Sequence, residues 1–312
     1  MREFRGSATF RLRGEMSFPS AFSGRNARVV ESVNQQMNGL LPLLVLAAPT
    51  VNTLQVPELS KWQSIPVPPK SKSGEMKAWI YAAMDAPVEW QVRMEAGKLI
   101  ARPAGKPDPL PAPLIALGYS AKYSKVQPIE GGWLVGVNRG EWGGELVRVW
   151  SPYKEAVKVS DHQIVDFFYR KGRLHAIEGL SHLGSSRGAV IRIGLSKTAF
   201  HFNASKVIEL PAAPRAVTVR RDGTVILILD GSVAALDHRN RLTILLPKLH
   251  EFSSNSCAIA PGTTRLYIGM RQYVAELDLI SRKLRYLVPS AAYLNRLPED
   301  EERRIREMYR HG

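Results

Sequence analysis

The sequence of 312 residues predicts an all-β fold, and three observations support this prediction. Most apolar segments after residue 76 are short and rich in β-branched and aromatic side chains. They are bounded by Gly, Asp, Asn or Ser, which are the residues that favour turns. No segment before residue 290 carries a sustained apolar stripe at helical spacing. We therefore expect strand after strand, followed by one helix at the C-terminus.

The individual strands are predicted from these segments, taken in chain order. We expect them at residues 77–84, 88–95, 132–137, 145–150, 164–170, 173–179, 188–195, 215–221, 224–230, 232–237, 241–247, 265–270, 273–279 and 283–289. A stretch with five prolines, residues 101–114, is excluded from helices and central strands. We interpret it as a connection between two β units.

A repeat underlies these strands. Residues 223–247 align with residues 264–289, so that Asp237 falls on Asp278 at the end of equivalent strands. The anchor residues of one recurring strand are spaced by 41, 51 and 41 residues; they are Trp133, Leu174, Val225 and Leu266. Units of about 40 residues with four strands are typical of β-propeller blades.

The repeated pattern, with a strand that ends in Leu-Asp, resembles blades of the β-propeller superfamily in its bacterial YVTN and PQQ-like repeat form. The resemblance covers residues 120–289 well and residues 76–119 poorly. It implies a single propeller of five or six blades, each with four antiparallel strands. The tryptophan-docking motifs of PQQ enzymes and the Trp-Asp dipeptide of WD40 repeats are missing. We therefore expect no cofactor.

The chain divides into five predicted regions. Residues 1–36 are interpreted as an over-extended or disordered N-terminus, and residues 37–48 resemble a signal peptide because of the apolar run 40–48. Residues 49–75 form a Pro-rich linker or an arm along a sheet edge, and residues 76–289 form the propeller. We predict a periplasmic or secreted protein, or a cytoplasmic one if residues 37–48 are instead a buried strand.

The last region, residues 290–312, is predicted to contain the C-terminal helix. Four acidic residues at its start and basic residues at its end match the helix dipole. Its apolar stripe consists of Leu294, Leu297, Ile305, Met308 and Tyr309. The stripe is consistent either with docking against the propeller or with binding a partner.

Charge and cysteine content limit the function classes. The formal net charge is +15, and the excess of Lys and Arg is spread along the chain. Such a basic surface attracts acidic partners. Because no stacking-aromatic module or zinc pattern accompanies the charge, we expect a protein partner or an acidic surface rather than nucleic acid. The single cysteine, Cys257, excludes an intramolecular disulfide and a Cys-based zinc site. We expect no transmembrane segment in the mature protein, and the oligomeric state stays open.

The best site signal comes from two enlarged connections between neighbouring strands. NRGEWGG, residues 138–144, joins the strands 132–137 and 145–150, and we expect residues 179–190 to be the equivalent enlarged loop of the next unit. Glycines at 140, 143 and 144 are expected to adopt positive φ angles. The candidate recognition residues of the two loops are Arg139, Glu141, Trp142, His182, Ser185 and Arg187. The alternative is a plain hairpin loop with Trp142 packed on a neighbour.

Motifs that carry chemistry are scarce. Asp222, Asp230, Asp237 and Asp278 recur at turns, where Asp side chains bond their own backbone. We expect no catalytic residue and no metal ligand. The predicted function is a non-catalytic exported propeller of the immunity or envelope-assembly type that binds a macromolecular partner or an acidic surface. The alternative is a propeller-class hydrolase or lactonase with a funnel active site; in propeller lactonases, Glu, Asn and Asp along the axis hold a metal.

Overall fold

The computed structural model describes residues 58–151, 155–195 and 201–310. The chain divides into two units, residues 1–53 and 54–312, and every described residue belongs to the second. The predictions for residues 1–36 and 37–48, and the first part of the segment 49–75, lie outside the described residues. None of the described helices combines the length and the apolar character that crossing a membrane requires.

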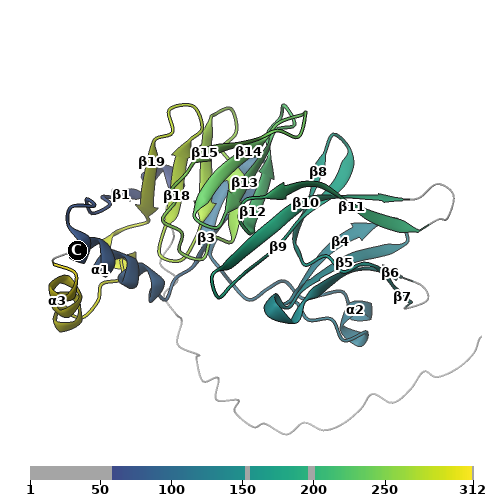
Figure 1. Ribbon diagram of the computed structural model, residues 1–312, viewed down its shortest axis with the longest axis horizontal. Coiled ribbons are helices and arrows are strands. Elements are labelled where there is room, and N and C mark those ends of the chain that lie inside the picture. The colour runs from purple at the N-terminus through teal and green to yellow at the C-terminus, as the bar shows by residue number, and fades with distance from the viewer. Residues whose placement is uncertain (1–57, 152–154, 196–200, 311–312) are drawn as a thin grey trace, which may run out of the picture. The chain divides into compact units, whose positions relative to one another are not determined.

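Four antiparallel sheets follow one another along the chain (Figure 1), and within each of them the strands lie side by side in chain order. Sheet I contains β4 (Ser124–Ile129), β5 (Gly132–Asn138), β6 (Gly144–Trp150) and β7 (Ala156–Ser160). Sheet II contains β8 (Ile164–Arg170), β9 (Arg173–His182), β10 (Ser185–Leu195) and β11 (Phe202–Leu210). Sheet III contains β12 (Pro214–Val219), β13 (Val225–Leu229), β14 (Ser232–Leu236) and β15 (Leu242–Leu246). Sheet IV contains β16 (Ser256–Ile259), β17 (Arg265–Gly269), β18 (Val274–Asp278) and β19 (Leu284–Val288), with β1 (Gln63–Ile65) added beside β19.

This architecture confirms the all-β prediction and the repeat. A four-stranded antiparallel meander is the blade of a β-propeller, so the chain has a propeller type of fold. The four anchors fall in the second strand of each sheet, namely Trp133 in β5, Leu174 in β9, Val225 in β13 and Leu266 in β17. The spacing from Leu174 to Val225 is longer because β9 and β10 are longer than their counterparts.

The sheets stack face to face, and β13 shows how the sequence encodes this arrangement. All five of its residues are buried. Because side chains alternate along a strand, Ile226 and Ile228 pack toward sheet IV, whereas Val225, Leu227 and Leu229 pack toward sheet II. A strand that is covered on both faces therefore appears as a continuous apolar run rather than as an alternating one.

The first strands of successive sheets contact one another: β4 lies against β8, β8 against β12, and β12 against β16. A two-stranded hairpin, β2 (Trp90–Glu95) and β3 (Lys98–Pro103), continues the series because β2 contacts β16. The buried indole of Trp90 anchors this hairpin, and its Nε1 donates a hydrogen bond of 3.1 Å to the carbonyl of Gln272. Four strands per unit are therefore present in sheets I to IV, and two in the hairpin.

The prediction of a strand at residues 77–84 was wrong. These residues belong to the helix α1 (Ser73–Met84), whose buried residues include Ala78, Ala82 and Ala83. Small side chains at helical spacing do not give the strong apolar stripe that identifies most helices. The larger residues Trp79 and Ile80 pack on the core of sheets III and IV, and their neighbours in sequence resemble an alternating strand.

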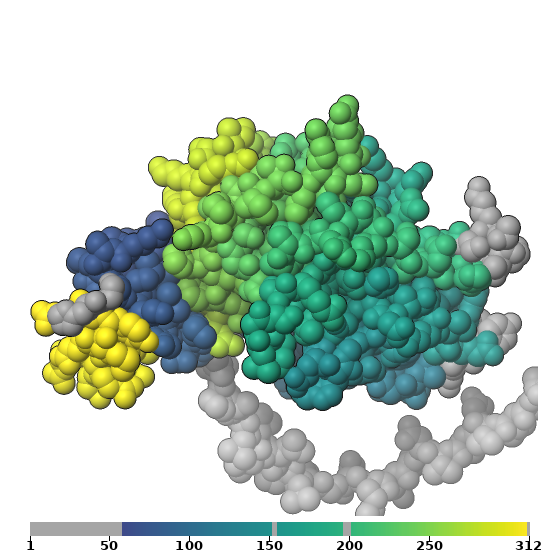
Figure 2. Space-filling view, in the orientation of Figure 1, coloured from purple at the N-terminus to yellow at the C-terminus, as the bar shows by residue number. Residues whose placement is uncertain are grey.

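The exclusion of helix from residues 101–114 was also wrong, since the short helix α2 (Ala112–Ala116) starts within this stretch. The start of a helix tolerates proline because its first N–H groups have no partner inside the helix. The C-terminal helix was confirmed as α3 (Glu299–Met308). It packs on α1 so closely that a Cβ on Gly74 would lie 2.6 Å from the carbonyl oxygen of Arg306. Figure 2 shows α3 in yellow against the first described residues.

Candidate recognition site at one end of the sheets

The second enlarged loop of the sequence analysis is not a loop. Residues 179–182 and 185–190 extend β9 and β10 into a ribbon with the pairs Gly179–Gly188, Ser181–Ser186 and His182–Ser185. The turn consists of Leu183 and Gly184, both with positive φ, 45° and 81°. Two such residues are typical of a tight hairpin turn that matches the twist of its strands. The segment is therefore a paired ribbon whose side chains alternate between two faces.

One face of the ribbon is joined to sheet I. The imidazole Nε2 of His182 lies 2.7 Å from the carboxylate Oε2 of Glu141. Glu141 belongs to a single 3-10 turn, Gly140–Trp142, inside the loop between β5 and β6. The two connections therefore meet at the end of neighbouring sheets, where all turns between second and third strands lie.

The side chain and backbone of Gln163 also hold these two segments together. Gln163, which is buried between sheets I and II, donates from its side-chain amide to the carbonyl of Gly140. Its side-chain oxygen accepts a hydrogen bond of 3.2 Å from Arg187. Its backbone carbonyl accepts the N–H of Gly179. One glutamine therefore bridges the loop of sheet I and the ribbon of sheet II.

The residues beside these contacts expose large apolar side chains. Trp142 follows Glu141 and is 79% exposed, and Leu183 follows His182 and is 91% exposed. The interpretation of Trp142 as packed on a neighbour is therefore wrong. We call Glu141, Trp142, His182 and Leu183 the ridge.

The remaining predicted residues lie close to the ridge without joining it. Arg139 lies 3.4 Å from Glu145 at the start of β6. Ser185 is paired with His182 across the ladder and is exposed. Among the glycines of this loop, Gly140 and Gly143 have positive φ as expected, but Gly144 does not. Gly144 is required for another reason, because a Cβ there would lie 2.3 Å from the carbonyl oxygen of Val137.

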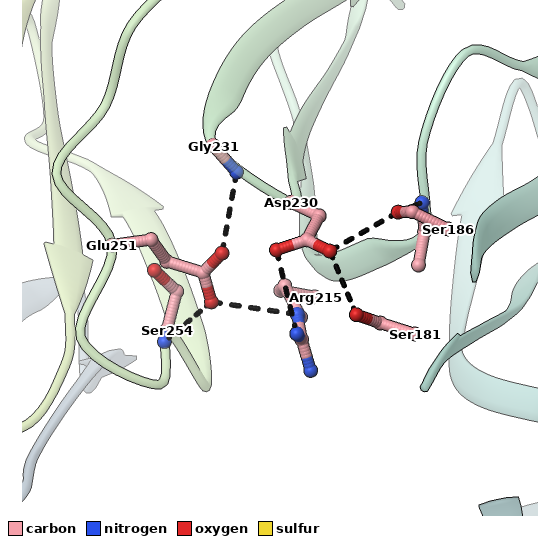
Figure 3. Close-up of polar contacts among 8 residues, drawn as sticks. Ser181, Ser186, Arg215, Asp230, Gly231, Glu251 and Ser254 are labelled. Carbon is pink, nitrogen blue, oxygen red and sulfur yellow. Dashed lines mark hydrogen bonds and ion pairs between the residues drawn. The ribbon is translucent and has the colours of Figure 1, made fainter. Parts of the chain in front are cut away.

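The opposite face of the ribbon carries a polar network that the sequence analysis did not predict. Asp230, at the end of β13, accepts a hydrogen bond of 2.7 Å from Ser181 and one of 3.1 Å from Ser186 (Figure 3). Arg215 lies between Asp230 and Glu251, at 3.5 Å and 3.4 Å from their carboxylates. We call these five residues the Asp230 network. It joins sheet II, sheet III and the connection to sheet IV.

Local backbone features direct these side chains toward one another. Arg215 is the residue left unpaired by a bulge between Pro214 and Ala216 in β12, and a bulge changes the direction of a side chain. Glycine at 179 and 188 lets sheet III approach the ribbon, because a Cβ on Gly188 would lie 2.4 Å from Pro214. Residues with larger side chains would hold the two sheets apart.

The two carboxyl groups of the network have opposite pKa shifts. Burial raises the pKa of Glu251, Arg215 lowers it in part, and the adjacent Asp230 raises it again, so that it lies above its ordinary value. Burial also raises the pKa of Asp230, but the hydroxyl of Ser181, the charge of Arg215 and further hydrogen bonds outweigh this effect. The pKa of Asp230 therefore lies below its ordinary value. Glu251 also accepts the backbone N–H groups of Gly231 and Ser254, so the carboxylates are engaged in contacts within the protein.

The four aspartates that were expected at turns have different roles. The prediction was right for Asp222, Asp237 and Asp278, which accept backbone N–H groups two to four residues ahead. It was wrong for Asp230, whose carboxylate contacts side chains of other strands. The pKa of Asp237 and that of Asp278 are both lowered to about 2 by hydrogen bonds from the turn backbone.

The first strands, which line the axis of a propeller, contain few acidic groups in the described residues. One of them is Asp166, within β8. Burial raises the pKa of this carboxyl, and Lys125 in β4 lowers it in part. Within the ranges that the structure describes, no three His, Cys, Asp or Glu side chains are placed to hold a metal ion.

No protein-family model matches the sequence, and no curated protein matches it. Several solved structures are similar to the chain. A virginiamycin B lyase from Staphylococcus aureus is 11% identical, with a TM-score of 0.39, over 64% of this chain and 65% of that one. A gluconolactonase from Xanthomonas campestris is 13% identical, with a TM-score of 0.37, over 63% and 64%. PorZ, a surface component of the type-IX secretion system of Porphyromonas gingivalis, is 11% identical, with a TM-score of 0.36, over 62% and 30%.

The match to a streptogramin B lyase spans 56% of that protein's length. These scores and identities are low. The description of the four sheets as propeller blades therefore rests on their own topology, with four strands in chain order in each sheet.

Proposed function

We propose that this chain is a non-catalytic β-propeller protein that binds a protein partner through the ridge. The observation that carries the proposal is the pair of apolar side chains on two neighbouring sheets, Trp142 at 79% and Leu183 at 91% exposure. Apolar surface of this kind gains about 25 cal/mol per Å² when a partner removes it from water. Tryptophan is also the residue type that most often dominates the binding energy of an interface.

The ridge is organised before a partner arrives. The contact between Glu141 and His182 joins its two halves, and Gln163 fixes the backbone of both segments beneath it. A surface that is already ordered loses less conformational entropy on binding. This separates the ridge from an exposed side chain on a free loop, which would have to be ordered by the partner.

The charge of the chain indicates the character of the partner. The net charge is +15, and the arginines at 139 and 187 lie beside the ridge. Complementary charge accelerates encounter and orients the two proteins. We therefore propose a partner whose surface offers an apolar pocket with an acidic rim. An immunity or envelope-assembly protein of the periplasm or the exterior is the class that this role suits.

The proposal includes two finer points. The hairpin β2–β3 takes the place of a fifth blade and supplies two of the four strands that a blade has. The propeller then has four complete blades and one partial blade, compared with the five or six blades expected from the sequence. Export depends on the signal-like residues 37–48 and is tested by N-terminal sequencing of the protein from its host. A mature N-terminus near residue 48 or 49 supports export, whereas intact residues 1–36 contradict it.

Quantitative affinity capture from host cells tests the binding role. The double variant Trp142→Ala/Leu183→Ala should lose a protein that the wild type retains, since each anchor contributes ~2 kcal/mol or more at an interface centre. Ile280 provides a matched control: it is 77% exposed but lies in the turn between β18 and β19, at the other end of the sheets. Ile280→Ala should retain the same protein. Equal capture by wild type, the double variant and the control would refute the role of the ridge.

A further inference from the structure

A cleft of about 760 Å³ separates the hairpin β2–β3 from sheet I. One wall is formed by the hairpin and by the proline-rich connection 103–111, and the other by residues 121–126 at the start of β4. At its floor are Ile164 and Val165 of β8. In a closed propeller, the last blade packs against the first. The cleft lies at this position, between the hairpin β2–β3 and sheet I.

The side chains of the hairpin explain why this gap is polar. One face of the hairpin, with Trp90 and Val92, packs on sheet IV in an apolar cluster. Gln91 and Arg93 alternate with these residues along β2, so they point to the other face and line the cleft. Apolar clusters fill the space between sheets I and II, II and III, and III and IV, whereas the side of the hairpin that lines the cleft offers charged groups to a ligand.

The charge of the lining is strongly positive. The cleft has five basic side chains, Arg93, Arg102, Lys106, Lys122 and Lys125, and one acidic side chain, Asp108. Arg93 and Arg102 share the carboxylate of Glu95. In the described part of the chain, none of the three lysines has a carboxylate within ion-pair distance. Lys122 lies over the ring of Tyr123, 4.9 Å from the ring centroid, and Lys125 is close enough to Asp166 to lower the pKa of that carboxyl. The excess of basic over acidic groups in the lining nevertheless attracts an acidic ligand.

Two strands that contribute residues to the cleft walls, β3 and β4, lie at the edges of their sheets. β4 is the first strand of sheet I and β3 is the outer strand of a two-stranded sheet, so each has an edge without a strand partner among the described residues. An unpaired edge offers N–H and C=O groups to an added extended chain. The proline-rich wall, with Pro103, Pro107 and Pro109, restricts the backbone and thereby favours a cleft that is formed before binding.

We propose that this cleft binds an extended acidic segment of a protein, in which Asp and Glu side chains meet the lysines while the backbone follows the strand edge. This site is distinct from the ridge and does not depend on the proposed role of the ridge. A protein segment is favoured over a nucleic acid because the cleft exposes one aromatic side chain, Tyr123, instead of the series on which bases stack. The prolines and strand edges suit a peptide backbone.

Fluorescence anisotropy with the full chain tests the proposal, using a short labelled peptide rich in Asp and Glu as the probe. The same peptide with Asn and Gln should bind at least about tenfold more weakly, because the charge contacts are lost. The variant Lys106→Glu/Lys122→Glu/Lys125→Glu should weaken binding of the acidic peptide by a similar factor. Trp142→Ala should bind this peptide like the wild type, which separates the cleft from the ridge.

A matched variant controls for overall charge. Lys171→Glu/Lys248→Glu/Lys283→Glu changes the net charge by the same amount at exposed lysines outside the cleft. It should retain binding, and equal weakening in both triple variants would overturn the proposal in favour of nonspecific attraction. Single-stranded DNA of equal charge is the second comparison. Tighter binding of the DNA, lost in the cleft variant, would identify a nucleic-acid site instead, and no binding of the acidic peptide would also overturn the proposal.

Discussion

The two faces of the β9–β10 ribbon both carry polar contacts to a neighbouring sheet, but these contacts differ in burial. On the face toward sheet III, the side chain of Glu251 is 8% exposed and those of Asp230 and Arg215 are 32% and 36% exposed, and their contacts join sheet II, sheet III and the connection to sheet IV. On the face toward sheet I, Glu141 and His182 are each 40% exposed and end in the open ridge. Both faces come from one alternating sequence of ten residues, 179–188.

The comparison shows how residue size and burial separate a structural contact from a binding surface. Gly179 and Gly188 let sheet III come close, so the Asp230 network connects two packed sheets, and Glu251 within it is shielded from water. In the ridge the contact between Glu141 and His182 is open to water, so it contributes little to folding. Its apolar side chains are free to contribute to binding instead.

The largest effect on stability is expected from the Asp230 network. Asp230→Ala removes the acceptor of Ser181 and Ser186 and one of the two carboxylates near Arg215. We expect the free energy of unfolding to fall by about 1–2 kcal/mol. This lies at the lower end of the range for hydrogen bonds to charged groups, because the carboxylate is partly exposed. Urea denaturation measures this loss. Asp222→Ala, which removes one hydrogen bond of a turn and one exposed ion pair with Arg220, is the control and should cost less. Equal losses would contradict the role of the network.

A smaller, pH-dependent effect is expected from Glu251. Its pKa in the folded protein lies above its ordinary value, so the protonated form is favoured by folding. Its contribution to stability is present below the unfolded pKa and is lost as the pH rises through the folded pKa. Glu251→Gln cannot titrate and should become more stable relative to the wild type over this rise. Denaturation of both proteins at a series of pH values measures the difference, and parallel curves would show that Glu251 does not titrate with a raised pKa.

The pH dependence of Asp230 has the opposite sign. Its folded pKa lies below the ordinary value, so its contribution is present above the unfolded pKa and is lost as the pH falls through the folded pKa. The penalty of Asp230→Ala should therefore shrink in acid. The two carboxyl groups of one network thus give opposite trends, which a general acid unfolding would not produce.

The repeat could be predicted from the sequence because it depends on local patterns. The turn aspartates Asp237 and Asp278 and the apolar strands around them recur at similar spacing, and each is determined by residues close in the chain. The helix α1 was missed because its burial depends on sheets III and IV, and its own sequence has small residues on the covered side. Tertiary contacts override weak local preference at such a place.

Of the candidate site, the contact between Glu141 and His182 could be predicted from the sequence, but the Asp230 network could not. The prediction that Glu141 and His182 lie at the same end follows from the repeat, because equivalent turns of a meander share an end. The Asp230 network was missed because residues 179–190 were interpreted as a loop, in which side chains have no fixed alternation. Had the ribbon been recognised, Ser181 and Ser186 would have been assigned to the face opposite His182. Their partner Asp230 is 49 residues from Ser181, which no local pattern indicates.

The smallest effect on stability is expected at the ridge, from Trp142→Ala. The indole is 79% exposed, so the folded protein gains little from burying it, and truncation leaves no cavity. We expect a change within about 0.5 kcal/mol, as is usual for exposed positions. Thermal unfolding of the purified variant measures this change without knowledge of the partner. A loss of about 3–5 kcal/mol, typical of a buried tryptophan, would show that Trp142 supports the fold, and it would remove the ridge as a binding surface. An unchanged melting temperature together with lost capture of the partner would separate binding from folding at this residue, in contrast to Asp230 on the other face of the ribbon.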